Sequence, residues 1–328
     1  KWAHSYLQFG LTIESALEIQ SITNFHASYN KNNLNDLAGE FRATASVGNE
    51  SQISAEIYQP LNPGLDYFVS VKTGINTDLI PTLLGDHIES MQSFNRQYIT
   101  VSTGKIFNQT TELSLGLRYN DGRITAITGP TFEKDTDFIE SYYYVKLFHD
   151  TLDNTSFPNT GFFSNISLTA NLEALGADLD YEQLRFHIGG AGTFGRYTIF
   201  SRAIIETTLD ELTADEIQAN TLFWRGGFLE LSGTIRNELP GQHFGMIETA
   251  FYRRHGNISL LPMYTGFSLE AGNAWMDSSE INSENIRLAG SLFIGAETFL
   301  GPIYLAIGAT DKGESAVYFN IGKSFLEN

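Results

Sequence analysis

The sequence contains no cysteine, few basic residues and no long apolar run. The lack of cysteine excludes a disulfide scaffold, thiol catalysis and thiolate metal sites. Only 20 Lys and Arg residues stand against 38 Asp and Glu, a net charge of -18, which argues against nucleic acid as a partner. No stretch approaches the roughly 20 apolar residues that a membrane helix needs. With 42% hydrophobic and 18% charged residues, the chain is too apolar for disorder and weakly charged for a soluble domain. All-β folds are therefore favoured.

Strict alternation of apolar with polar or small residues is the dominant pattern in the chain. Between 112 and 120 every odd position is Leu or Tyr, and the even positions are Glu, Ser, Gly, Arg and Asn. The stretches 184–189, 266–272, 303–308 and 317–322 alternate in the same way. A period of two residues is typical of strands with one apolar face.

The second face of these strands separates two kinds of β protein. A soluble sandwich or solenoid, the alternative interpretation, would expose a face rich in Lys and Glu. Here that face is rich in Gly, Ser, Asn and isolated charges, and aromatic residues crowd the strand ends. Apolar-out, polar-in strands of about ten residues with aromatic girdles are typical of a transmembrane β-barrel.

The alternating segments and their connections predict an antiparallel barrel of sixteen strands. The predicted strands are 4–15, 17–30, 36–49, 51–60, 65–77, 92–106, 110–121, 139–150, 160–172, 181–190, 195–208, 240–253, 262–275, 285–299, 301–311 and 314–325. An even number agrees with closed single-chain bacterial barrels. With both termini periplasmic, the outward connections 78–91, 122–138, 173–180, 209–239 and 276–284 are long. The inward ones, such as 61–64, 107–109 and 191–194, are shorter, as expected for this class. Residues 1–328 are thus predicted to form one barrel domain.

The sixth outward connection, 209–239, is unusually long for a segment without periodicity, and such loops are functional or disordered. Its centre, 223–233, is rich in aromatic residues and glycine and contains a single arginine, Arg225. This composition indicates packing inside a confined space, where a guanidinium needs a carboxylate partner. A surface loop with an ordinary turn is the alternative.

The segment Arg225-Gly226-Gly227-Phe228 resembles the arginine–glycine–aromatic signature of the sixth extracellular loop in the superfamily of BamA, TamA and two-partner-secretion transporters. It departs from that signature by an extra glycine before the aromatic residue and by Trp224 in place of an aliphatic one. Three further segments resemble the same superfamily: 150–161 its turn before the ninth strand, 267–275 its thirteenth strand and 299–305 its turn before the fifteenth.

The first quarter of the chain carries a narrower resemblance. Segments 6–10, 35–40, 58–61 and 67–69 are similar to the barrel of patatin-like phospholipase autotransporters, the type Vd secretion class. This implies an outer-membrane translocator that secretes or displays an N-terminal passenger, a patatin-like lipase. The passenger and a periplasmic repeat are expected upstream of Lys1, outside this chain.

The resemblance also implies a lock between the loop and the barrel wall. Arg225 is expected to reach into the lumen, with the loop folded there, and to pair with Glu248 and Glu270. Alternation independently turns both carboxylates toward the lumen, where solvation by lumen water is the alternative.

A second expected site is the seam where strand 4–15 pairs with strand 314–325. Gly10 lies in the first of these strands, Gly313 and Gly322 flank or interrupt the last, and Phe325 is its terminal aromatic residue. Glycine weakens a strand and permits bending. The resemblance implies a lateral gate at this seam, and ordinary packing of the glycines is the alternative.

Catalytic motifs are not found in this stretch. It contains no G-x-S-x-G nucleophile elbow and no H-E-x-x-H spacing, so we expect no enzyme, no cofactor and no metal site. Acid-rich loop stretches could bind divalent cations that bridge lipopolysaccharide, although solvated loops are the preferred interpretation.

These patterns predict a protein of the bacterial outer membrane. The alternatives to the translocator are a BamA- or TamA-like assembly factor and a diffusion porin. The expected partners are outer-membrane lipid and lipopolysaccharide, the protein's own passenger and the barrel assembly machinery during insertion. Nucleic acid is not expected, and a homodimer is possible.

Overall fold

The computed structural model describes residues 5–16, 20–84, 87–128, 135–258, 261–298 and 300–322. The first eight strands are β1 (Ser5–Ala16), β2 (Gln20–Lys31), β3 (Glu40–Gly48), β4 (Ser51–Pro60), β5 (Tyr67–Leu84), β6 (His87–Phe107), β7 (Thr111–Thr128) and β8 (Thr136–Asp150). They are followed by β9 (Gly161–Asn171), β10 (Tyr181–Phe194), β11 (Tyr197–Thr208), β12 (Phe223–Arg225), β13 (Leu239–Gly241), β14 (His243–Ile258), β15 (Leu261–Trp275), β16 (Arg287–Thr298), β17 (Gly301–Thr310) and β18 (Ser315–Ile321). Two short 3-10 helices, η1 (Glu173–Leu175) and η2 (Ser278–Glu280), lie in connections.

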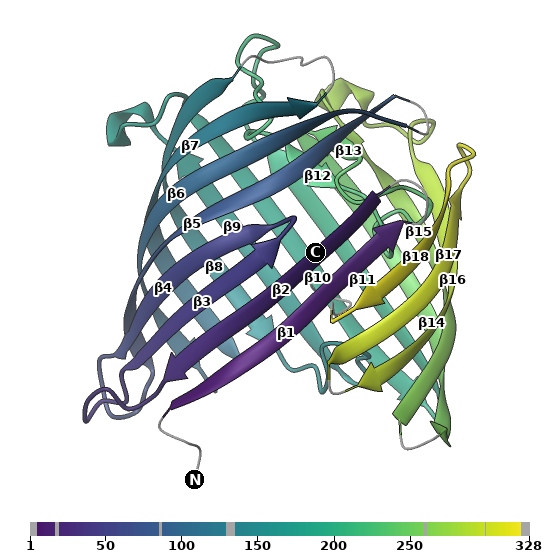
Figure 1. The fold of residues 1–328 in the computed structure, drawn as a ribbon, viewed down its shortest axis with the longest axis horizontal. Helices are drawn as coiled ribbons and strands as arrows, with labels where there is room; N and C mark the ends of the chain where they lie inside the picture. The colour runs from purple at the N-terminus through teal and green to yellow at the C-terminus, as the bar shows by residue number, and fades with distance from the viewer. Residues whose placement is uncertain are drawn as a thin grey trace. The chain divides into compact units, whose positions relative to one another are not determined.

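Within the described residues, sixteen of these strands form a closed antiparallel barrel. Strands that follow one another in sequence are neighbours, as the run from β3 to β7 shows in Figure 1, and β1 closes the sheet against β18. β12 and β13 form a separate two-stranded sheet. The predicted all-β, sixteen-stranded barrel is confirmed.

Across the described ranges, no helix combines the length and apolar character needed to span a membrane.

Close contacts group the chain into two compact units. The first consists of Lys1–Leu11, Thr23–Phe148 and Ser167–Glu182, and the second of Thr12–Ile22, His149–Ile166 and Gln183–Asn328. The long connection between β11 and β14 belongs to the second unit, together with the residues that bind it in the site described below.

The two faces of the strands differ as alternation predicts. On β14 and β15, Ile247 is 64% exposed and Leu269 60%, whereas Glu248 and Glu270 on the opposite face are buried. The side chains of a strand point alternately to its two faces, so every second residue lies on the polar face. The apolar face is exposed to the surroundings, and the polar face carries the contacts described below.

The turn between β8 and β9 packs against the polar face of β14 to β17. Phe157 is fully buried, and its ring stacks on Tyr264 with 3.9 Å between the centroids. Tyr304 donates a hydrogen bond of 2.6 Å to the Ser156 carbonyl. The carboxylate of Asp153 accepts backbone hydrogen bonds from within the turn. These contacts give the turn a fixed conformation.

Two predicted outward loops are wrong. Most of 78–91 is strand, because β5 pairs with β6 up to Leu84 opposite His87. Residues 122–128 and 136–138 likewise belong to β7 and β8. The alternation weakens there, with Pro81 inside β5, but pairing with the neighbouring strand supplies the backbone hydrogen bonds that the local sequence does not specify. For the same reason β10 extends through the predicted turn 191–194.

Candidate functional site at the loop between β11 and β14

The connection between β11 and β14 is a folded element with a narrow neck. β12 and β13 pair in antiparallel register, with Arg225 opposite Leu239. Beyond the neck, the segment 228–235 is almost completely inaccessible to solvent. Such burial distinguishes this connection from an ordinary solvated loop.

Left-handed backbone conformations let the segment turn back within a few residues. Gly226 and Gly227 have φ angles of 123° and 109°. A Cβ atom on Gly226 would lie 2.6 Å from the Ile235 carbonyl oxygen, so only glycine fits there. Leu229 and Leu231 also have positive φ, which is unfavourable for a residue with a side chain. Burial of Leu231 in the cluster of Ile204, Phe244 and Met246 offsets this strain.

Arg225, at the end of β12, makes a two-pronged ion pair with Glu206 of β11. Its Nε and Nη2 atoms lie 2.8 and 2.5 Å from the two carboxylate oxygens of Glu206. Its Nη1 atom lies 3.4 Å from Glu230 Oε1. The Glu206 side chain is fully buried and is also within reach of His187, at 3.0 Å, and Arg185, at 3.6 Å. A bidentate pair of this kind is both strong and directional.

A second arginine, Arg202, occupies the same face of β11 and binds Glu248. Arg202 lies directly opposite Glu248 in the β11–β14 register, and their Nε and Oε2 atoms are 2.5 Å apart. Its Nη2 atom also donates a hydrogen bond of 2.7 Å to the carbonyl of Leu229 in the loop. Arg202 therefore connects the barrel wall to the loop.

Glu270 holds the loop through Ser232. It lies opposite Glu248 in the β14–β15 register. The amide and the hydroxyl of Ser232 donate hydrogen bonds of 2.6 and 2.7 Å to the two oxygens of Glu270. Charge-assisted bonds to a buried carboxylate are among the stronger ones in proteins.

The ion-pair partners of Arg225 therefore differ from those expected. Glu248 and Glu270 lie on the polar face and are buried, but Arg202 and Ser232 bind them, while Arg225 binds Glu206 and Glu230. The physical reason is register: Arg202 is the cross-strand neighbour of Glu248, and the neck holds Arg225 next to Glu206.

Sequence reasoning missed Arg202, Glu206, Glu230 and Ser232. For Arg202 and Glu206 the sequence held a signal. Both occupy even-numbered positions in the predicted strand 195–208, so their side chains lie on the same face of that strand.

Phe228, at the tip of the arginine–glycine segment, lies in an aromatic cluster. Its ring centroid is 5.9 Å from that of Phe293, 5.8 Å from Tyr304 and 5.7 Å from Tyr318. Aromatic pairs at these separations add to the stability gained by burial. Tyr304 also contacts Phe157 of the β8–β9 turn.

The expected seam residues have different surroundings. Gly10 lies within β1, where a Cβ would collide with His26 of β2. Gly313 is in the turn between β17 and β18 with open space around it. Gly322 follows β18 and donates a hydrogen bond to the Pro302 carbonyl. Phe325 lies outside the described residues.

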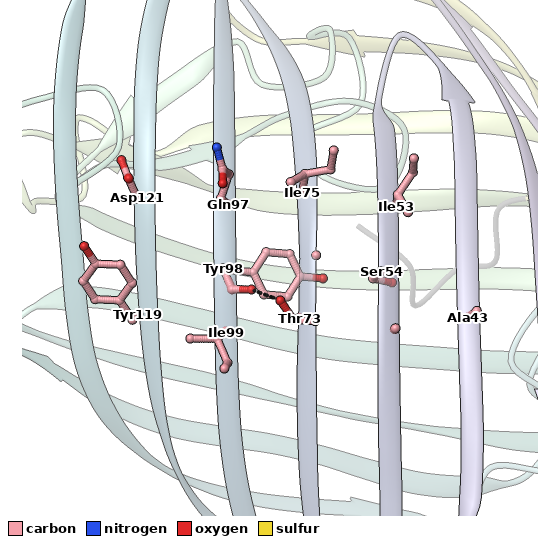
Figure 2. Close-up of a pocket in the computed structure, with 12 residues that line it drawn as sticks. Ala43, Ile53, Ser54, Thr73, Ile75, Gln97, Tyr98, Ile99, Tyr119 and Asp121 are labelled. Carbon is pink, nitrogen blue, oxygen red and sulfur yellow. Dashed lines mark hydrogen bonds between the residues drawn. The ribbon is translucent and has the colours of Figure 1, made fainter.

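A hollow of about 630 Å³ lies on the exposed apolar face of β3 to β7 (Figure 2). Ile53, Ile75 and Ile99 border it, and the Thr73 hydroxyl donates a hydrogen bond to the Tyr98 carbonyl beside it. Ser54, Gln97 and Asp121 line it together with these isoleucines, so the hollow is of mixed polarity. Among the described residues, no group of three or more His, Asp or Glu side chains is placed to hold a metal ion.

Comparison with known proteins identifies the family of this chain. A model of the Omp85 superfamily domain matches residues 33–241. The chain belongs to the Omp85 superfamily. Barrels of this superfamily lie in the bacterial outer membrane and translocate or assemble proteins. No curated protein matches the sequence closely enough to serve as a relative.

Solved structures support the same barrel architecture. BamA from Haemophilus ducreyi, lacking POTRA domains 1–3, superimposes with a TM-score of 0.77 at 12% identity over 97% of this chain and 69% of that chain. CdiB from Escherichia coli and from Acinetobacter baumannii each give a TM-score of 0.67 at 11% identity, over 96% and 98% of this chain. The chain spans only 62% and 60% of the two CdiB chains.

Proposed function

We propose that this Omp85-superfamily barrel is a translocator that secretes or displays a passenger polypeptide carried N-terminal to it. The observation that carries the proposal is the arginine–glycine segment of the β11–β14 loop, bound through Arg225, Ser232 and Phe228 to the polar face of the surrounding strands. A loop anchored by buried charges is a specific built element, because such contacts cost desolvation and need matched partners.

The loop is proposed to lie in the lumen. Support comes from the strand faces: the residues that bind it, Arg202, Glu206 and Glu248, lie on the face opposite the exposed Ile199 and Ile247. With the termini periplasmic, this loop is on the extracellular side. Three connections that are outward in this orientation, 172–180, 209–242 and 276–286, are long, which supports it.

The passenger is proposed to be a patatin-like lipase. This rests on the similarity of the first quarter of the chain to the type Vd barrels. Lipid, lipopolysaccharide and the assembly machinery are the further proposed partners, and native mass spectrometry in detergent would detect a homodimer.

The second candidate is an assembly factor for other outer-membrane barrels. Superfamily membership favours it equally with export, and the barrel is similar in fold to that of BamA. A diffusion porin is less well supported, because its lumen would have to accommodate the packed loop as well as an open channel.

The test uses the full-length gene product in cells. Passenger exposure is measured by surface protease digestion and by lipase activity on intact cells. Arg225→Ala should leave the passenger inside the cell, and Arg225→Lys should retain part of the export because it keeps the charge but loses the two-pronged geometry. Arg123→Ala is the matched control, because it removes an exposed ion pair with Asp137.

The outcomes distinguish the candidate functions. The Arg225 variants are compared with the wild type at equal amounts of barrel in the membrane. Normal passenger exposure in Arg225→Ala would refute the role of the loop in export. A fall in other outer-membrane proteins when the full-length protein is depleted would identify an assembly factor. Steady ion conductance of the purified barrel in a planar bilayer would favour a porin.

A further inference from the structure

The loop also contacts both terminal strands of the barrel. In the described residues, β1 and β18 pair from Ile13 opposite Ile321 to Ala16 opposite Tyr318. Two of the buried side chains on the polar face of this seam bind the loop: Glu14 of β1 and Tyr318 of β18. Both bind the same short segment of the loop, residues 233–236.

Tyr318 binds the loop through both functions of its hydroxyl group. The Gly233 amide donates a hydrogen bond of 2.7 Å to this oxygen, and the hydroxyl donates one of 2.6 Å to the Thr234 carbonyl. Gly233 has a φ of 120°, and a Cβ there would lie 2.8 Å from the carbonyl carbon of Ala309 in β17. Only glycine permits so close an approach of the loop to the wall. The loop is thereby held against β18.

Arg236 binds the opposite side of the seam. Its Nη1 atom lies 3.5 Å from Glu14 Oε2, and the Glu14 side chain is 7% exposed. A carboxylate this deeply buried is costly without a cationic partner. Arg236 follows Thr234 by two residues, so one short segment is bonded to β18 and to β1.

We propose that residues 233–236 form a latch that holds β1 against β18, so that the seam opens only when this part of the loop is released. This inference deepens the proposed function and rests on it for its consequence, that export through the seam requires release of the latch. The latch itself is a property of the barrel and its loop, and it is tested by a measurement that does not depend on export.

The test is amide hydrogen exchange of the purified full-length protein in phospholipid nanodiscs. Arg236→Ala should raise exchange at residues 13–16 and 315–321 about tenfold, the effect of losing a charged hydrogen bond at a partly exposed site. Tyr318→Phe removes a single oxygen atom and should raise exchange at the same residues. Arg123→Ala, which also removes an ion pair but does not contact the seam, should leave them unchanged.

A charge exchange tests the pair directly. Glu14→Arg alone should raise seam exchange, and Glu14→Arg combined with Arg236→Glu should reverse most of that rise. Unchanged seam exchange in both Arg236→Ala and Tyr318→Phe would overturn the latch, as would a rise of the same size in Arg123→Ala. Raised seam exchange in Arg236→Ala together with reduced passenger export would contradict the proposed consequence and leave the latch intact.

Discussion

The partner of Arg225 can be tested by a double-mutant cycle that separates the geometry of the structure from the expectation of the sequence. The structure pairs Arg225 with Glu206 through two short contacts, whereas the family resemblance implies Glu248 and Glu270. We predict strong coupling between Arg225→Ala and Glu206→Gln. Coupling between Arg225→Ala and Glu270→Gln should be close to zero, because Glu270 binds Ser232 instead.

The magnitude follows from burial. Removing one member of a buried ion pair costs about 3–5 kcal/mol. Arg185 and His187 remain near Glu206 when Arg225 is lost, so the lower end, about 3 kcal/mol, applies. Since about 1.4 kcal/mol corresponds to a factor of ten, the loop should open about a hundredfold more often.

The assay is hydrogen exchange at the Gly233 amide, which donates to the Tyr318 hydroxyl while the loop is docked and whose acceptor is unchanged in every variant. Exchange is followed in lipid nanodiscs for the wild type, each single variant and the double variants. A coupling energy of about 2 kcal/mol between Arg225 and Glu206 is expected. Equal coupling to Glu270, or loop exchange within twofold of the wild type in Arg225→Ala, would refute the reasoning.

Three further predictions concern single sites. Phe157→Ala should lower the free energy of unfolding by about 3–5 kcal/mol, measured by urea unfolding in detergent, because its buried ring stacks on Tyr264; a loss below about 1 kcal/mol would contradict this. Gly313→Ala should cost about 1–2 kcal/mol for its positive φ, and Gly233→Ala clearly more, because only at Gly233 would the Cβ meet backbone of β17; equal costs would be inconsistent with the close approach. Partial burial, which raises the pKa of Asp153, is outweighed by hydrogen bonds from its own turn, so the pKa lies below its ordinary value. Its contribution to stability is therefore complete above the ordinary carboxylate pKa and lost as the pH falls through the lowered one, and Asp153→Asn should remove this part of the acid dependence of unfolding.

The number and order of the strands could be predicted from the sequence because the alternation of apolar and polar residues is visible within each barrel strand. Alternation between 112 and 120, for instance, places residues on the two faces of β7 without reference to any other strand. The ends of β5 and β6 could not be predicted in this way. Their outer parts are strands because each supplies hydrogen bonds to the other, a property of the pair and not of either segment.

In the candidate site, too, some features follow from the sequence and others only from the tertiary structure. Alternation by itself determined that Glu248 and Glu270 share the polar face, and composition determined that the segment around Arg225 is not an ordinary loop. The tertiary structure decided the partners: cross-strand register brings Arg202 to Glu248, and the β12–β13 neck brings Arg225 to Glu206. Only the folded loop brings Arg236 to Glu14. The direction of a side chain is a local property with a period of two residues, but its partner depends on the register between strands and on the path of a loop, which separate contacting residues by long stretches of chain.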